Sequence, residues 1–185
     1  LTSGNASVLF GARDASNVFM WSVNTLDNEK EPLIRRHIYD RGRLQSSDTP
    51  IGKFFTKSDL LNKEHHLAIE AKDGVVKTYI DKVLVDTYTD TDSKLSNGYI
   101  GFRAFRGNNT NETAMFDNIV LTEYEQKGDK EEAKVVLKED FEKPQSAFEG
   151  GEIVSMGGNR KLNMVSGSGD YRVLQVDMSG VPMFR

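Results

Sequence analysis

The sequence of 185 residues contains no cysteine, a single tryptophan and only four prolines. The absence of cysteine excludes disulfides, thiolate metal sites and a cysteine nucleophile. No apolar run approaches the roughly 20 residues that a membrane-spanning helix needs, so we expect no membrane span. The net charge of −4 provides no basic surplus of the kind that binds nucleic acid, so we expect no nucleic-acid partner.

Short runs in which apolar and polar residues alternate make up most of the chain, and turn formers such as Lys72-Asp-Gly74 separate them. The ranges expected to form strands are 6–12, 18–24, 33–39, 51–55, 65–71, 75–81 and 83–88. Residues 57–63 are expected to form one helical turn, with Ser58 as its cap. Many short strands with almost no helix are typical of an all-β sandwich or barrel.

Two further apolar runs, residues 98–105 and 115–121, flank a loop rich in glycine and asparagine. This pattern predicts two adjacent strands. Alternation in the first run places Ile100 and Phe102 on one face, with Tyr99 and Arg103 on the other. An arginine beside aromatic and small residues on a strand face is typical of a recognition surface.

The composition changes after residue 124. Residues 125–134 are rich in charge around a single glycine, which predicts a solvated linker. Residues 135–185 form a β-rich tail that either packs on the sandwich or begins the next β domain. The chain starts without methionine, and we expect it to be a piece of a longer protein.

Several motifs follow one another in an order that resembles a known family. They are Val8-Leu-Phe-Gly-Ala-Arg-Asp14, Asn17-Val-Phe-Met-Trp21, Leu33-Ile-Arg-Arg-His37, Gly98-Tyr-Ile-Gly-Phe-Arg103 and Phe116-Asp-Asn-Ile-Val-Leu121. Over roughly residues 5–124 the chain resembles the concanavalin A-like, laminin-G-type jelly roll appended to many bacterial glycoside hydrolases. In addition, Val181-Pro-Met-Phe-Arg185 resembles the entry to the β-sandwich ahead of the catalytic barrel in bacterial α-L-rhamnosidases.

The resemblance implies an antiparallel jelly-roll sandwich over residues 1–124 with additional C-terminal strands. It also implies an accessory module of a periplasmic, cell-surface or secreted bacterial enzyme that degrades polysaccharides. The implied partners are an oligo- or polysaccharide, including rhamnose-containing ones, and neighbouring domains of the same polypeptide. In this family function would lie on the concave face of the front sheet.

Sugars are bound by aromatic faces and by forked donors such as arginine. The candidate carbohydrate-binding residues of these types are Arg13, Trp21, Arg35, His37, Tyr99 and Arg103. Each has a structural alternative. A lone Trp21 in a sandwich is usually a core residue. Arg13 and Arg103 could instead form ion pairs, and of the adjacent Arg35 and Arg36 at least one would merely be solvated.

Catalysis by the chain itself is not indicated, because its carboxylates lie in turn-rich segments and no Glu-x-Asp-x-x-Glu signature is present. The adjacent His65 and His66 would point to opposite faces of a strand and could not share a metal. Asp90 and Asp92 are weak candidates for a structural Ca²⁺, and no other cofactor is expected. Three hypotheses follow: a carbohydrate-binding module, a structural spacer of the same enzyme, and a self-contained jelly-roll glycosidase.

Overall fold

The computed structural model describes residues 4–14, 16–26, 28–91, 99–105, 114–127, 130–140, 152–154, 161–166, 172–177 and 181–184. Beyond residue 140 it describes the course of the backbone alone. These residues form antiparallel β-sheets and one short helix, α1 (Lys57–Leu60), which confirms the all-β prediction. No helix in the described ranges is long and apolar enough to cross a membrane.

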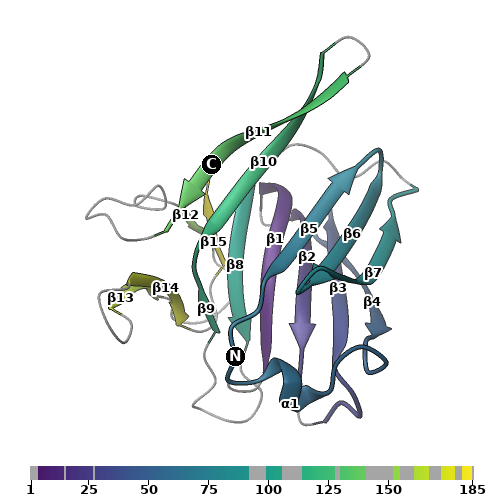
Figure 1. The fold of residues 1–185 in the computed structure, drawn as a ribbon, viewed down its shortest axis with the longest axis vertical. Helices are drawn as coiled ribbons and strands as arrows, with labels where there is room; N and C mark the ends of the chain where they lie inside the picture. Colours follow the sequence, from purple (N-terminus) through teal and green to yellow (C-terminus); the bar gives the residue numbers. More distant parts are fainter. Residues whose placement is uncertain are drawn as a thin grey trace.

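A seven-stranded sheet forms one layer of the molecule (Figure 1). Its strands, in spatial order, are β12 (Glu152–Val154), β15 (Val181–Phe184), β8 (Tyr99–Phe105), β1 (Asn5–Asp14), β2 (Asn17–Asn24), β3 (Leu33–Asp40) and β4 (Arg43–Pro50). Three further strands form a smaller sheet against it: β5 (Leu67–Lys72), β6 (Val75–Ile80) and β7 (Val83–Thr89). The two sheets form a sandwich, with α1 at one end (Figure 1).

The main core fills the space between these two sheets. The large sheet contributes Phe10, Phe19, Trp21, Ile34 and Ile38, and the small sheet contributes Val76, Ile80 and Val85. The ring of Trp21 lies 5.0 Å from that of Phe10 and 5.5 Å from that of Tyr88, in edge-to-face contact. Because each buried side chain of this size adds roughly 1.5–3 kcal/mol, this cluster holds the two layers together.

A second apolar cluster lies on the opposite face of the large sheet, and a bulge in β1 brings Ala12 into it. Gly11 has a φ of 57°, and the pairing register shifts between Phe10 and Asp14. As a result Ala12 joins Leu9 in a cluster with Val18 and Met20 on the opposite face of the sheet. Uninterrupted alternation along residues 6–12 would place Ala12 on the face of Phe10, and the bulge moves it to the other face.

Strand β4 and the segment after it differ from the sequence-based prediction. No strand was predicted over 43–50, because these residues are polar, and in the structure nearly all of them are exposed at the sheet edge. Residues 51–55 form turns instead of the predicted strand, with Ile51 fully buried. The helix is capped by Thr56, in a capping box with Asp59, and not by Ser58.

Residues 125–134 were predicted to be a linker, but 125–127 and 130–134 lie instead in the two strands of a hairpin. Its strands are β10 (Ile119–Lys127) and β11 (Lys130–Glu139), and they extend away from the sandwich (Figure 1). An isolated two-stranded hairpin is marginally stable in water. The Lys72 ammonium lies 2.6 Å from Glu131 and 5.9 Å from the centre of the Tyr124 ring, so the end of β5 contacts the hairpin.

The backbone of the tail continues the sheets of the preceding domain. Strand β15 pairs with β8, and β12 pairs with β15. Strand β14 (Arg172–Asp177) pairs with both β13 (Lys161–Ser166) and β9 (Ala114–Phe116). The tail is therefore β-structured where it is described, as expected for a β-rich tail.

Candidate functional site: the outer face of the large sheet

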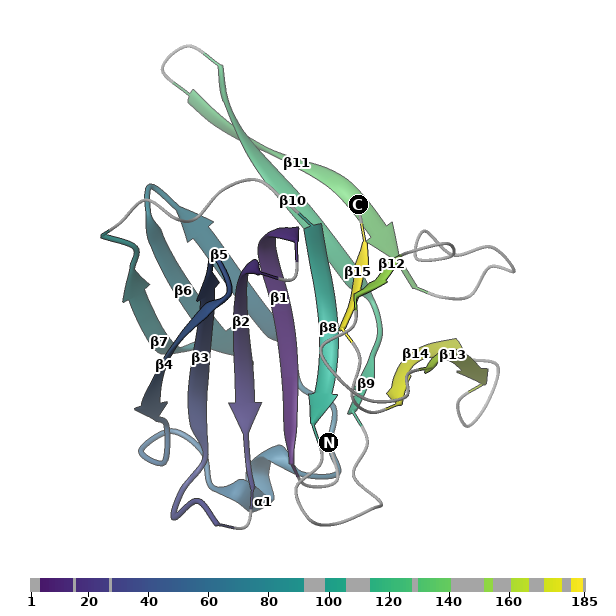
Figure 2. The same ribbon diagram turned by 180° about the vertical axis from the view of Figure 1, so that it is seen from behind.

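The large sheet has a face turned away from β5, β6 and β7, which we call the outer face. Figure 2 looks onto the strands that form it. One row of directly paired residues crosses five strands of this face: Arg103 on β8, Ser7 on β1, Ser22 on β2, Arg35 on β3 and Asp48 on β4. The neighbouring row runs through Gly101, Leu9, Met20, His37 and Ser46. Strand pairing thus brings Arg35, His37 and Arg103 to one surface.

Arg35 is the centre of an ion-pair network. Its Nε and Nη2 donate to the two carboxylate oxygens of Asp48 at 2.9 and 2.8 Å, a bidentate arrangement. The same Nη2 also donates to Glu29 Oε1 at 2.8 Å. The hydrogen bond to Asp48 raises the pKa of Arg35, and the same bond lowers the pKa of Asp48. Arg35 Nη1 takes part in no recorded hydrogen bond within the described residues.

His37 lies between Met20 and Ser46 in the second row. Burial lowers its pKa, and the positive charges of Arg103 and then Arg35 lower it further. The imidazole is consequently neutral at neutral pH. Its Nδ1 is buried and has no hydrogen-bond partner among the described residues.

Arg103 reaches toward His37 over the side chain between them. Its Nη1 lies 3.7 Å from the sulfur of Met20, which is the direct strand partner of His37. The hydroxyl groups of Ser7 and Ser22, in the row of Arg103, lie 2.7 Å apart and bond to each other. These two hydroxyl groups therefore satisfy each other at the centre of the outer face, and Arg35 and His37 lie beside them on β3.

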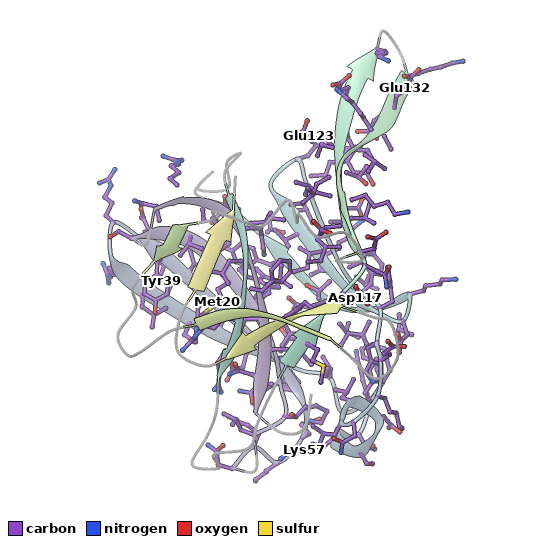
Figure 3. The ribbon with its side chains drawn as sticks, turned by 90° about the vertical axis from the view of Figure 1, so that its left-hand side faces the viewer. Met20, Tyr39, Lys57, Asp117, Glu123 and Glu132 are labelled. Atoms are coloured by element: carbon purple, nitrogen blue, oxygen red, sulfur yellow. The ribbon has the colours of Figure 1, made fainter. Side chains whose placement is uncertain are left out.

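The end of the outer face near the β3–β4 turn is apolar and open. Tyr39 is half-buried against the Leu9, Val18 and Met20 cluster, and its strand partner Leu44 is 46% exposed. Figure 3 shows Met20 and Tyr39 among the strands of the large sheet, whereas Glu123 and Glu132 mark the hairpin. A tyrosine ring beside an exposed leucine supplies the kind of surface on which sugar C–H groups stack.

Of the remaining predicted residues, Trp21 and Arg13 lie elsewhere. Trp21 is 2% exposed in the main core, so its ring cannot serve as a platform for a sugar. Arg13 follows the bulge in β1 and is exposed, and the interrupted alternation no longer places it on the outer face. Tyr99 pairs with Ala12 through its backbone, and its side chain lies outside the described part of the structure.

The neighbouring Arg36 corrects a second expectation, that one of the two adjacent arginines would merely be solvated. Arg36 lies on the inner face, 3.7 Å from Asp86 of the small sheet and 5.4 Å from the centre of the Tyr88 ring. Arg35 is held by Asp48 on the outer face. Both arginines are therefore engaged in the structure.

The metal candidates do not form a site in the described residues. Asp90 is buried, with its backbone N–H bonded to Gly74, and Asp92 lies outside the described residues. Within the described ranges no group of three or more histidine, aspartate or glutamate side chains is placed to hold a metal ion. His65 instead contacts Asp81 through Nδ1 at 2.7 Å.

Four residues of the outer face were not among the predicted candidates. Tyr39 could have been included, because alternation along residues 33–39 already places it on the face of Arg35 and His37. Asp48 and Ser46 were missed because the polar strand β4 was not predicted. Glu29 lies in a loop, and no periodicity could have placed it beside Arg35.

Comparison of the chain with protein-family models, with curated proteins and with solved structures found no match.

Proposed function

We propose that this chain is a non-catalytic carbohydrate-binding module, and that its parent is a secreted or envelope bacterial glycoside hydrolase of the α-L-rhamnosidase type. The observation that carries the proposal is the gathering of Arg35, His37 and Arg103 on the outer face, beside the half-buried ring of Tyr39. The parent enzyme and its location rest on the sequence resemblance alone.

The chemistry of these residues supports binding of a saccharide. Arg35 is held in place by Asp48 and Glu29, so its free Nη1 edge is preorganised and loses little entropy on binding a hydroxyl. The neutral imidazole of His37 can accept or donate a hydrogen bond. In such a pair the arginine donates hydrogen bonds to two hydroxyls of a sugar, and the aromatic ring packs on its C–H groups.

The same network argues against a glycosidase centred here. A glycosidase requires one carboxylic acid whose pKa is raised so that it can protonate the leaving group. The pKa of Asp48 is lowered by its hydrogen bonds with Arg35. Asp48 is thus a poor proton donor, and catalysis in the proposed parent would belong to another domain.

A structural spacer is the second candidate. It is favoured by the engagement of Arg35 with two carboxylates, which would equally stiffen the edge of a sheet that binds nothing. Calorimetry with rhamnose-containing oligosaccharides separates the two. Millimolar or tighter binding is expected for the module, and no heat of binding at millimolar sugar would favour the spacer.

The Arg103→Ala variant tests the surface within the same experiment. Loss of one charge-assisted hydrogen bond should weaken binding by about 1.5–3 kcal/mol. Lys134→Ala, which removes a cation from the exposed hairpin, is the matched control and should bind as wild type does. Equal affinity for the Arg103→Ala variant and the wild type would remove Arg103 from the site.

A further inference from the structure

The outer face is not uniform, and its two halves differ in what they can offer a ligand. Over β1 and β2, Leu9 and Met20 are buried, with exposed fractions of 0% and 1%. Over β3 and β4, Tyr39 is half-buried, and Leu44 and Ser46 are exposed. A ligand that uses an apolar surface can therefore reach it at the β3–β4 edge.

The residues of this edge form three successive cross-strand pairs of β3 and β4. Tyr39 is paired with Leu44, and His37 is paired with Ser46. The next pair along the strands is Arg35 with Asp48. An apolar surface is thus followed, along the strand direction, by an imidazole, a hydroxyl and a guanidinium, over about the length of a disaccharide at roughly 3.4 Å per residue.

Around Arg35 the carboxylates outnumber the guanidinium, which disfavours one class of saccharide. The positive charge of Arg35 is offset by Asp48 at 2.8 Å and by Glu29 at 2.8 Å. Two carboxylates therefore flank the one guanidinium of β3 that faces the edge, and His37 is neutral because of its lowered pKa. An acidic sugar brought to Arg35 would meet two negative charges at short range.

We propose that an uncharged sugar packs on Tyr39 and Leu44 and places its hydroxyls at His37 and Arg35, and that Asp48 and Glu29 exclude uronate-containing saccharides. This assignment rests on the proposed carbohydrate-binding function and adds the class of sugar and its position on the sheet. Arg35 acts here as a hydroxyl donor, not as a carboxylate receptor. Asp48 both orients it and sets the selectivity.

The test measures affinity by calorimetry for two probes of similar length, a neutral rhamnose-containing oligosaccharide and an oligogalacturonate. The neutral probe should bind at least about tenfold more tightly. Asp48→Asn keeps an oxygen that can accept from Arg35 but removes one negative charge. It should therefore shrink this preference by about threefold or more.

Two variants test the position of the sugar. Tyr39→Ala should weaken binding of the neutral probe by about five- to tenfold, the scale of one aromatic packing contact. Tyr124→Ala, at an exposed tyrosine on the hairpin, is the matched control and should bind as wild type does. Because Tyr39 also packs on the buried cluster, Leu44→Ala serves as a second variant that leaves the fold intact, with an expected loss of about threefold.

The outcomes separate this inference from the function on which it rests. If the neutral probe binds but oligogalacturonate binds as tightly or more tightly, the proposed selectivity is overturned and the carbohydrate-binding function stands. If neither Tyr39→Ala nor Leu44→Ala weakens binding, the assigned position is overturned. If neither probe binds to the wild-type protein, the proposed function fails and this inference fails with it.

Discussion

Replacing Asp86 with alanine should destabilise the protein by about 3–5 kcal/mol, because it leaves the buried guanidinium of Arg36 without its counter-charge. The Asp86 side chain is 1% exposed and lies 3.7 Å from the guanidinium of Arg36, which is itself only 14% exposed. The hydroxyl of Thr49 donates to Asp86 at 2.7 Å. These contacts join β3 and β4 of the large sheet to β7 of the small sheet.

The magnitude follows from what the substitution leaves behind. An ion pair at this depth adds little net stability, since its attraction only offsets the cost of removing both charges from water. Removing one partner leaves the desolvated guanidinium of Arg36 without a counter-charge. For a chain of this size the loss should lower Tm by roughly 6–20 °C.

Urea denaturation followed by tryptophan fluorescence is a direct assay, because the buried Trp21 is the cross-strand partner of Arg36. The double variant Arg36→Met/Asp86→Leu should recover most of the loss, as apolar replacements of buried pairs often do. If Asp86→Ala costs less than about 1 kcal/mol, or if the double variant is less stable than the single, the interpretation of this contact as a buried inter-sheet ion pair is wrong.

Three further predictions concern the helix cap and two titrating groups. Thr56→Ala should cost about 1 kcal/mol in urea denaturation, whereas Ser58→Ala should cost less than half as much, since Thr56 is the cap. By NMR, His37 should titrate below 6.5, with Arg103→Ala raising its pKa. Because the folded-state pKa is the lower one, His37 should cause stability to fall as the pH drops below about 6.5. The pKa of Asp81 is lowered in the folded state, so Asp81→Asn should reduce the loss of stability between about pH 5 and pH 3.

The strands that alternate strongly were predictable from the sequence, because burial of one face imposes a period of two on the residues. Strand β6 (Val75–Ile80), with Val76, Thr78 and Ile80 buried in alternation, is the clearest case. Strand β4 could not be found in this way. It lies at an edge with both faces largely in water, and its residues carry no apolar period.

The hairpin β10–β11 shows a second limit of composition. Charge and a central glycine indicated a linker, and the segment is indeed exposed. In its register Lys127 lies opposite Lys130 and Glu125 lies opposite Glu132. The ion pairs of Lys127 with Glu132 at 2.6 Å and of Lys134 with Glu125 at 3.6 Å are diagonal contacts that offset these like-charge pairs. Cross-strand pairs of this kind become visible only once the register is known.

For the candidate site, alternation correctly placed Arg35 and His37 on one face and Arg103 opposite the residues of its strand that pack inward. It could not place Arg13, because the bulge at Gly11 shifts the phase of β1. It could not place Trp21 either, since alternation assigns a residue to a face without showing which face is covered by a second sheet. The packing of the small sheet against the large one shows that the face of Trp21 is the covered one.

Chemical-shift mapping of the wild-type protein tests the central claim most directly. A neutral rhamnose-containing oligosaccharide is titrated into isotope-labelled protein at millimolar concentration. Saturable shifts are expected on the outer face, at the amides and side chains of β3 and β4 around His37, while the β5–β7 sheet stays unchanged. Saturable shifts confined to β5–β7 or to the hairpin, or no saturable shift at all, would contradict the assignment of saccharide binding to the outer face.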